Sequence, residues 1–344
     1  MKGGFIIFLI RRIINAIVTI FLLIVLLFIL LHIIAPNPLT LAKIYSGNPH
    51  PTYAQLLVVE KEYGLNKPLY VQIITYIWNL LHGNLGEDPI YKVPVINLLS
   101  KYIPRTLEIT IPATILSVIM GLISGAIAAS NRGKGLDYFL RGVYLVTWAS
   151  PTFLIATVFQ LAVAYYLKLL PPYGIVNPAL TPPPNTTGFP LLNALLAGDW
   201  PYFISVLRHM ILPVVSLAVA NFGIVTRISR ASMLVNMNAD YAKLSLMKGL
   251  SRRKVVYGVV LRNASIPIVT LIALLFGSSM AGSVAVEDIF QYHGMGWFIT
   301  NSLLNLDYVG IISTTIIVAI SVITANLIAD IMYGILDPRV RVIG

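Results

Sequence analysis

The feature that most limits the fold of this chain is a series of long apolar runs without a charged residue. A bilayer core of about 30 Å is crossed by about 20 residues of α-helix. Five runs have that length: 13–34, 109–130, 142–167, 263–286 and 308–329. A sixth, 209–226, becomes long enough if 200–207 extends it, with Arg208 near the interface. Because lipid-spanning segments must satisfy their own backbone polar groups, the runs predict an all-α membrane protein with six transmembrane helices.

Composition agrees with a membrane location. By length alone, 344 residues suit about two soluble domains, but 57% hydrophobic and 11% charged residues override that expectation. The first run follows Lys2, Arg11 and Arg12, so it resembles a secretory signal peptide. It is too long for an ordinary signal core, and no small-residue cleavage site follows it. We therefore expect this segment to be retained as a transmembrane helix.

The distribution of charge predicts the orientation. With the N-terminus inside, the inner segments 1–12, 131–141, 227–262 and 336–344 carry 16 Lys and Arg and three acidic residues. The outer segments 36–104, 169–205 and 287–307 carry five Lys and eight acidic residues. This asymmetry follows the positive-inside rule and places both termini in the cytoplasm. It also accounts for most of the net charge of +11, so binding to nucleic acid is not needed to explain it.

Motifs for catalysis or nucleotide binding are not found. Gly133-Lys134-Gly135 lacks the spacing and the hydroxyl of a phosphate-binding loop, so the chain has no evident ATP site. The five histidines are scattered without metal-ligand spacing, and there are no cysteines. The small residues at 277–281 resemble a nucleophile elbow only loosely, and small residues in a span are typical of helix packing. We predict no catalytic residue, no metal site and no cofactor in this chain.

An ion-driven mechanism has no evident carrier group either. Such carriers usually hold ionisable side chains at membrane depth. The interiors of the predicted spans contain none, and the polar residues Asn221 and Asn326 are neutral. We expect these two asparagines to form hydrogen bonds between helices.

The predicted outer segments differ in kind. Segment 36–104 is the longest, and its patches 58–63 and 71–81 have a helical pattern. Segment 170–198 contains seven prolines, which predicts an irregular, extended chain.

A short basic segment, DYAKLSLMKGLSRRK at 240–254, lies between the fourth and fifth spans. Asn238 or Asp240 could cap a helix here, Gly249 could end it, and Ser251 could begin the next turn. A helical projection gives two faces. The first is small or aliphatic: Ala239, Ala242, Leu246, Leu250. The second is larger and partly polar, with Ser245 beside it: Tyr241, Leu244, Lys248.

This pattern favours a helix that packs on its own protein and presents the other face to a partner. A helix lying on a membrane surface would have one large apolar face and one charged face, which is not seen here. The alternative is that the eight Lys and Arg of 227–262 serve topology alone.

Several stretches, taken in order, resemble one family. They are the start FLIRRIINAIVTIFLLIVLLFILLHIIAPNP, YGLNKPL at 63–69, GNLG at 83–86, PRTLE at 104–108, SPTF at 150–153, VEDIFQYHGMGWFI at 286–299 and ANLIADIMYGILDPRVR at 325–341. Together with segment 240–254 they resemble the B-type permease subunit of the oligopeptide/dipeptide (Opp/Dpp) family of binding-protein-dependent ABC importers. The similar stretches cover nearly the whole chain.

The resemblance implies a type I ABC importer permease fold. Its parts would be an N-terminal stub with the first span (1–35), an outer loop region (36–105), the shared transmembrane domain (106–333, with coupling loop 227–262) and a cytoplasmic tail (334–344). Its implied partners are a paralogous second permease, two ABC ATPase subunits that bind ATP and Mg, an extracellular solute-binding protein, and the lipid bilayer of the cell membrane.

The resemblance also assigns segment 240–250 to ATPase coupling. Five positions match the family pattern: Asp240, Tyr241, Lys248, Gly249 and Leu250. Four depart from it, because the general pattern has Glu-Ala-Ala six to four residues before the glycine and a small residue two before it: Lys243, Leu244, Ser245 and Met247.

The expected function is ATP-driven import of di- or oligopeptides by a subunit that is not itself an enzyme. Related importers move oligosaccharides or nickel, which stay open as alternatives. A channel or secondary carrier that works without nucleotide is a rival from another class, and an intramembrane enzyme is a more distant one.

Overall fold

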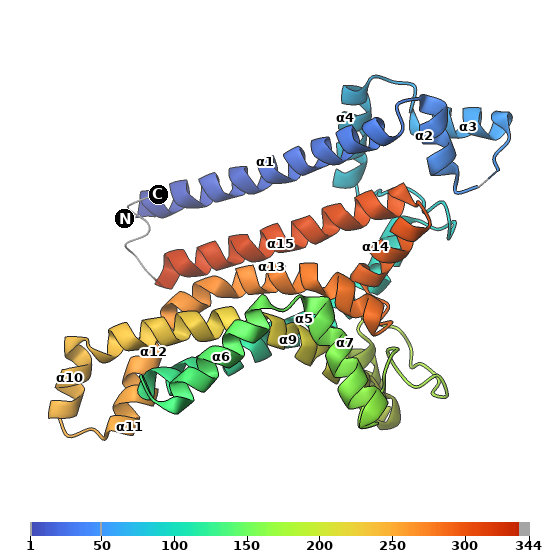
Figure 1. The fold of residues 1–344 in the computed structure, drawn as a ribbon. Helices are drawn as coiled ribbons and strands as arrows, with labels where there is room; N and C mark the ends of the chain where they lie inside the picture. Colours follow the sequence, from blue (N-terminus) through green and yellow to red (C-terminus); the bar gives the residue numbers. More distant parts are fainter. Residues whose placement is uncertain (1, 49, 337–344) are drawn as a thin grey trace.

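The computed structural model describes residues 2–48 and 50–336, and the ordered elements in this part of the chain are helices (Figure 1). Five helices are long and apolar enough to cross a membrane. They are α1 (Lys2–Ile34), α5 (Val95–Ser130), α9 (Trp200–Met237), α13 (Ile266–Ile289) and α15 (Tyr308–Leu336). A bent pair supplies the sixth span if it is counted as one. The prediction of an all-α, multi-span protein is confirmed.

The bent pair stands where the sequence predicted a third span at 142–167. α6 (Gly135–Ala149) and the following α7 (Thr152–Phe159), with its π-helical continuation η1 (Gln160–Tyr166), meet at 107°. The break lies at Ser150-Pro151, where Ser150 is extended (φ −84°, ψ 129°). Proline lacks an N–H and disfavours helical backbone in the residue before it, so the helix ends there.

Two helices are longer than the spans predicted for them. α5 begins at Val95 and has 36 residues, and α9 continues to Met237 and has 38. At 1.5 Å per residue each is over 50 Å long, well beyond the ~30 Å hydrocarbon core. α5 therefore runs through the predicted domain boundary at 105/106, and the first eleven residues of the predicted loop 227–262 are helix.

A close crossing of α5 and α9 forms the centre of the bundle. Gly121 lies against Val225, and a Cβ at Gly125 would approach Ser229 Cβ to 2.5 Å. The two glycines form a GxxxG motif, whose missing side chains let helix backbones approach closely. The sequence contains this motif, but the motif alone does not identify the helix that packs against it.

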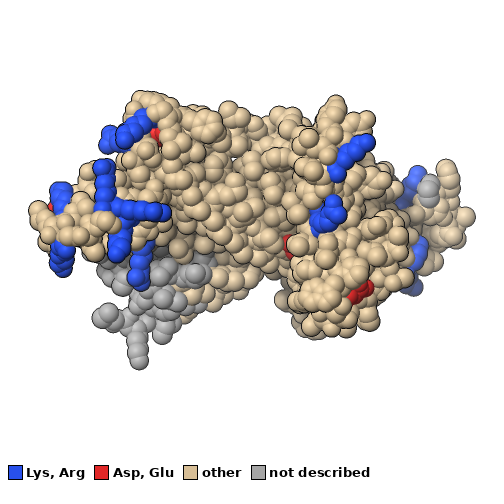
Figure 2. All heavy atoms as spheres, turned by 90° about the horizontal axis from the view of Figure 1, so that it is seen from below, with Lys and Arg blue, Asp and Glu red and all other residues tan. Residues whose placement is uncertain are grey.

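The remaining helices gather at the two ends of the bundle (Figure 1). What we call the α4 end carries α2 (Pro38–Ser46), α3 (Tyr53–Tyr63), α4 (Leu69–Leu81), α8 (Pro190–Ala197) and α14 (Met295–Leu304). The α10 end carries α10 (Asp240–Met247), α11 (Arg252–Lys254), η2 (Val255–Val260) and α12 (Leu261–Ala264). The densest group of Lys and Arg on the face in Figure 2 lies at the α10 end.

Helices α2 to α4 form a small outer subdomain beside α1 and α15. Asn37 caps α2, and Thr52 and Gln55 form a reciprocal capping box on α3. Gly47 ends α2 with φ +60° and lies against the backbone of Pro89, where a side chain would not fit. The helical patches predicted at 58–63 and 71–81 are confirmed. In the Pro-rich segment, α8 is a short helix that was not predicted.

Candidate functional site

Helix α10 at the α10 end holds most of the residues that the sequence predicted for ATPase coupling. Ala239 breaks the chain direction after α9 with extended backbone (φ −70°, ψ 152°), and Gly249 ends the next turn with φ +82°. The predicted stop at Gly249 is therefore confirmed. The prediction that Ser251 begins the next turn is also confirmed, because its Oγ accepts a hydrogen bond from Lys254 N at 3.4 Å. The predicted N-cap is wrong: α10 has no side-chain cap, and the Asn238 Nδ2 donates to Leu234 O of α9 at 3.0 Å.

One face of α10 packs on its own protein. Ala242 is 2% exposed and joins a cluster with Met233 of α9 and Val255 and Val256 of η2. Tyr241 packs against the same cluster, and its hydroxyl donates to Asn236 Oδ1 at 2.5 Å. This anchoring decides how α10 is rotated about its axis.

The rest of the α10 segment carries apolar side chains that no other part of the protein covers. Leu244 is 54% exposed, Leu246 48%, Met247 83% and Leu250 40%. Lys243 and Lys248 are also exposed, and Lys243 Nζ reaches Asp240 Oδ1 at 3.5 Å. Such an exposed ion pair contributes little stability. Four exposed large apolar side chains beside two lysines on one short segment are suited to contact with another protein.

The two faces therefore differ from those the helical projection gave. Leu246 and Leu250 were predicted on the packed face but are exposed, and Tyr241 was predicted beside Leu244 but turns inward. The helix is only eight residues long and Leu250 lies past its end. The rotation of α10 about its axis is set by the packing of Ala242 against α9 and η2. The spacing of residues in the sequence does not reveal these contacts.

We expect Tyr241→Ala to loosen α10, whereas Tyr241→Phe should stay close to wild type. Phenylalanine keeps the ring packing and loses one hydrogen bond, worth about 1 kcal/mol. Alanine loses both, so amide hydrogen exchange across 240–250 should accelerate at least about tenfold in the isolated protein. Equal exchange in the alanine variant and the wild type would show that Tyr241 does not anchor this helix.

A partly buried ion pair joins α6 to α9, the helix that precedes α10. Arg230 of α9 donates to Asp137 of α6 through Nε at 2.7 Å and through a terminal nitrogen at 2.8 Å. Asp137 is 1% exposed and also accepts from Gly133 N at 3.1 Å. A two-pronged guanidinium–carboxylate pair is geometrically specific, so it holds α6 and α9 in one register. In the sequence these residues stood out only as topological charges.

Hydrogen bonds between α5, α9 and α13 line the middle of the bundle. Asn221 Nδ2 donates to Ser279 Oγ at 2.9 Å, and Ser279 Oγ lies 3.2 Å from Thr114 Oγ1. Ser124 and Thr226 hydroxyls pair at 2.8 Å. The predicted interhelical role of Asn221 is thus confirmed. Ser279 is fully buried in this hydroxyl and amide network, as expected for a packing residue.

Two carboxyl groups that lie just outside the predicted spans are buried within the long helices. Glu108 of α5 is 7% exposed and Glu287 of α13 is fully buried, because both helices extend beyond the predicted spans. Glu287 accepts from Thr106 Oγ1 at 2.7 Å and from Trp297 N at 3.0 Å. Glu108 accepts from Leu191 N at 2.7 Å and from Tyr292 Oη at 2.8 Å.

These four bonds join three separate parts of the chain. They tie the Pro-rich segment and the α13–α14 turn to α5, while a terminal nitrogen of Arg105 donates to His293 O at 3.1 Å. Each oxygen of the two carboxylates already accepts a hydrogen bond. We therefore interpret Glu108 and Glu287 as acceptors that hold segments in place.

Two further carboxyl groups are buried at the α4 end. Asp88 is fully buried in the loop after α4, and Asp307 is 1% exposed just before α15. Asp307 accepts from Gly310 N at 2.9 Å and from Ser302 Oγ at 3.0 Å. Burial raises the pKa of Asp307 to about 6, and repulsion from the nearby carboxylate of Asp88 contributes to this increase.

This raised pKa predicts that stability falls as pH rises. The unfolded pKa is about 3.9, so the contribution from protonated Asp307 is complete below about pH 4 and is lost through pH 6. Asp307→Asn keeps an oxygen for Gly310 N and cannot ionise. Relative to this variant, the wild-type melting temperature should drop by at least about 2 °C between pH 4 and pH 7. Parallel pH profiles of the two proteins would contradict this assignment.

Comparison with known proteins identifies the family. Residues 117–342 match the family described as binding-protein-dependent transport system inner membrane component, and residues 5–98 match the N-terminal region described for such membrane components. The dipeptide transport system permease protein DppB of Escherichia coli (strain K12) is 32% identical over 339 residues, covering 97% of this chain and 98% of that protein.

Two other relatives give the same result. The di/tripeptide transport system permease protein DppB of Pseudomonas aeruginosa (strain UCBPP-PA14) is 34% identical over 81% of this chain and 82% of its own length. The oligopeptide transport system permease protein OppB of Haemophilus influenzae (strain ATCC 51907 / DSM 11121 / KW20 / Rd) is 31% identical over 97% and 99%. The chain is therefore a multi-pass membrane protein that belongs to the family of inner membrane components of binding-protein-dependent transport systems.

Proposed function

We propose that this chain is one permease subunit of an ATP-driven importer of di- or oligopeptides. The exposed apolar side chains of α10 carry the proposal, because such side chains at the basic end of a chain without a phosphate-binding loop are suited to contact a separate ATPase. The named substrates of its full-length relatives, dipeptides and oligopeptides, support peptides as cargo. They give no support to the alternatives of oligosaccharides or nickel.

In this proposal α10 docks on an ABC ATPase subunit in the cytoplasm. Leu244, Met247 and Leu250 supply apolar contacts, and Lys243 and Lys248 supply rim charges. Tyr241 and Ser245 act indirectly, because Tyr241 holds α10 on α9 and Ser245 Oγ donates to Tyr241 O at 2.7 Å. The Lys243-Leu244-Ser245 sequence makes this contact particular to its own ATPase. ATP and Mg are bound by the partner subunits.

Motion would pass from α10 into the bundle along α9. This helix is continuous from α10 to the α4 end, is fastened to α6 by Asp137–Arg230, and crosses α5 at Gly121 and Gly125. When two ATPase subunits close, α9 and α5 are expected to move together and to open the path between this chain and a paralogous permease. A solute-binding protein would deliver peptide at the α4 end, outside the cell, with both termini in the cytoplasm.

A channel or secondary carrier is the rival function. Against it stands the observation that all four oxygens of Glu108 and Glu287 are used as hydrogen-bond acceptors within the protein. A carrier for protons or sodium needs such a group to be available.

The deciding experiment is reconstitution of the complete complex and of the two permeases alone in proteoliposomes. Uptake of labelled dipeptide should need the ATPase subunits, ATP inside the vesicle and the solute-binding protein outside. Uptake by the permeases without ATP would instead establish the channel or carrier. The same assay with labelled maltotriose or nickel tests the alternative cargoes.

A further inference from the structure

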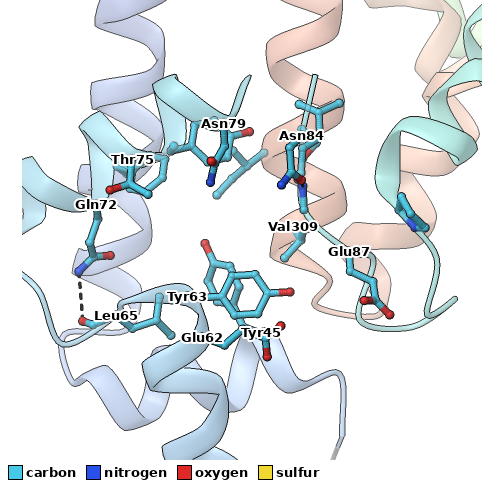
Figure 3. A pocket seen from close by; sticks show the side chains of 17 residues that line it. Tyr45, Glu62, Tyr63, Leu65, Gln72, Thr75, Asn79, Asn84, Glu87 and Val309 are labelled. Atoms are coloured by element: carbon cyan, nitrogen blue, oxygen red, sulfur yellow. Dashed lines mark hydrogen bonds between the residues drawn. The ribbon is translucent and has the colours of Figure 1, made fainter. Parts of the chain in front are cut away.

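A cavity of about 480 Å³ lies where the outer subdomain meets α1 and α15 (Figure 3). Its walls come from α1, α2, α3, α4, the loop after α4, and the first turns of α15. The hydroxyl and amide seam between α5, α9 and α13 contributes no residue to it. The volume is in the range of small-molecule sites and is too small for a folded partner.

The walls of this cavity are rich in hydrogen-bond acceptors. Glu62 and Glu87 are exposed carboxylates on its lining, from α3 and from the loop after α4 (Figure 3). The amides of Asn79 and Asn84 also face it. Gln72 Nε2 donates to Leu65 O at 3.1 Å and to Lys67 O at 2.8 Å, which uses both its N–H groups and leaves its oxygen to accept. Among the described residues that line the cavity there is no Lys, Arg or His.

Three tyrosines add aromatic faces and neutral hydroxyls. The rings of Tyr45 and Tyr63 lie 4.9 Å apart, and Tyr76 packs edge-on against Phe28 at 5.1 Å. Burial raises the pKa of Tyr45 and Tyr63, and that of Tyr76 to about 12, so all three stay protonated. The Tyr76 hydroxyl is buried and forms no hydrogen bond of good geometry. The Ser313 hydroxyl is its polar neighbour.

We propose that this cavity binds the cationic group of an alkylammonium or alkylguanidinium ligand. Two carboxylates supply the opposite charge, and amide and phenol oxygens accept the N–H donors of the cation. Tyrosine faces add cation–π attraction. An anion would meet two like charges and no basic side chain among the described lining residues.

The direct test uses n-butylguanidinium and its neutral isostere n-butylurea. Each is titrated against the purified protein in nanodiscs by saturation-transfer NMR. We expect saturable binding of the guanidinium and at least about tenfold weaker binding of the urea. The double variant Glu62→Gln/Glu87→Gln should weaken guanidinium binding at least about tenfold. Glu60→Gln removes a carboxylate from the same helix that does not line the cavity, and should leave binding unchanged.

Three results would each overturn the proposal. They are the absence of saturable binding, equal binding of the guanidinium and the urea, and guanidinium binding that the Glu62→Gln/Glu87→Gln variant does not weaken. Because both glutamates are exposed, the Gln variants are expected to fold, and an unchanged melting temperature checks this. A second double variant, Tyr63→Phe/Asn79→Leu, removes acceptors without removing charge and should weaken binding several-fold.

A last measurement separates two sources of the cation. Excess n-butylguanidinium is added while the solute-binding protein is captured on the complex. If n-butylguanidinium reduces capture by the wild-type complex but not by the Glu62→Gln/Glu87→Gln complex, the ligand of the cavity is a basic side chain of that protein. Undisturbed capture, with direct binding intact, would assign it to a free cationic solute. Failure of peptide transport would leave the binding test itself unaffected.

Discussion

Replacing both Leu244 and Met247 by alanine should lower ATP-dependent peptide uptake at least about tenfold while the protein stays folded. The two side chains are 54% and 83% exposed, so their removal leaves no cavity in this chain. If they are anchors of an interface, each truncation costs about 1–2 kcal/mol of docking energy, and about 1.4 kcal/mol corresponds to a factor of ten. ATP hydrolysis by the ATPase subunits should persist without being linked to uptake.

The control is Leu304→Ala, which shortens a 78% exposed leucine at the opposite end of the bundle. It should lower uptake far less than the double variant. Normal transport by the Leu244→Ala/Met247→Ala complex would refute docking through this face of α10. A lowered melting temperature of the double variant would show instead that the two residues support the fold.

Gly125→Ala should destabilise the protein by about 1–3 kcal/mol, the usual cost of overpacking a close contact. A Cβ there would lie 2.5 Å from Ser229 Cβ and 2.9 Å from Arg230 N, both on α9. Since backbone atoms cannot move aside easily, α5 and α9 must separate. The same helices carry the proposed motion, so uptake should fall together with stability.

Gly142→Ala is the matched control, because a Cβ at Gly142 meets no atom within 4 Å and the residue lies inside α6. Alanine favours helix over glycine by about 0.5–1 kcal/mol, so this variant should be as stable as wild type or slightly more. Stability is measured by reversible unfolding in mixed detergent. Equal stability of the Gly125→Ala and Gly142→Ala proteins would mean that the α5–α9 crossing is not close-packed.

Features that depend on local pattern could be predicted from the sequence. Helices α3 and α4, the end of α10 at Gly249 and the cap at Ser251 follow from spacing, backbone preference and capping chemistry over a few residues. The spans were located but their lengths were underestimated. Glu108 and Arg227 each end an uncharged run, but helices α5 and α9 continue through these residues.

Features that depend on contacts between distant residues could not be predicted. The exposed face of α10 was misassigned because rotation of a short helix is decided by Ala242 against Met233 and Val255. The burial of Glu287 could not be predicted either, because Thr106, 181 positions away, supplies one of its hydrogen bonds.

The sequence by itself determined that this chain crosses a membrane several times, has no phosphate-binding-loop motif and carries a short basic segment at 240–254. Length, hydropathy and charge are sufficient for that, because the bilayer imposes one rule on every span. Only the tertiary structure decided which side chains of that segment face outward, where the third span bends, and that Asp137 and Arg230 join α6 to α9. Those outcomes depend on the packing of surfaces from different helices, and a single linear pattern does not specify their mutual rotation.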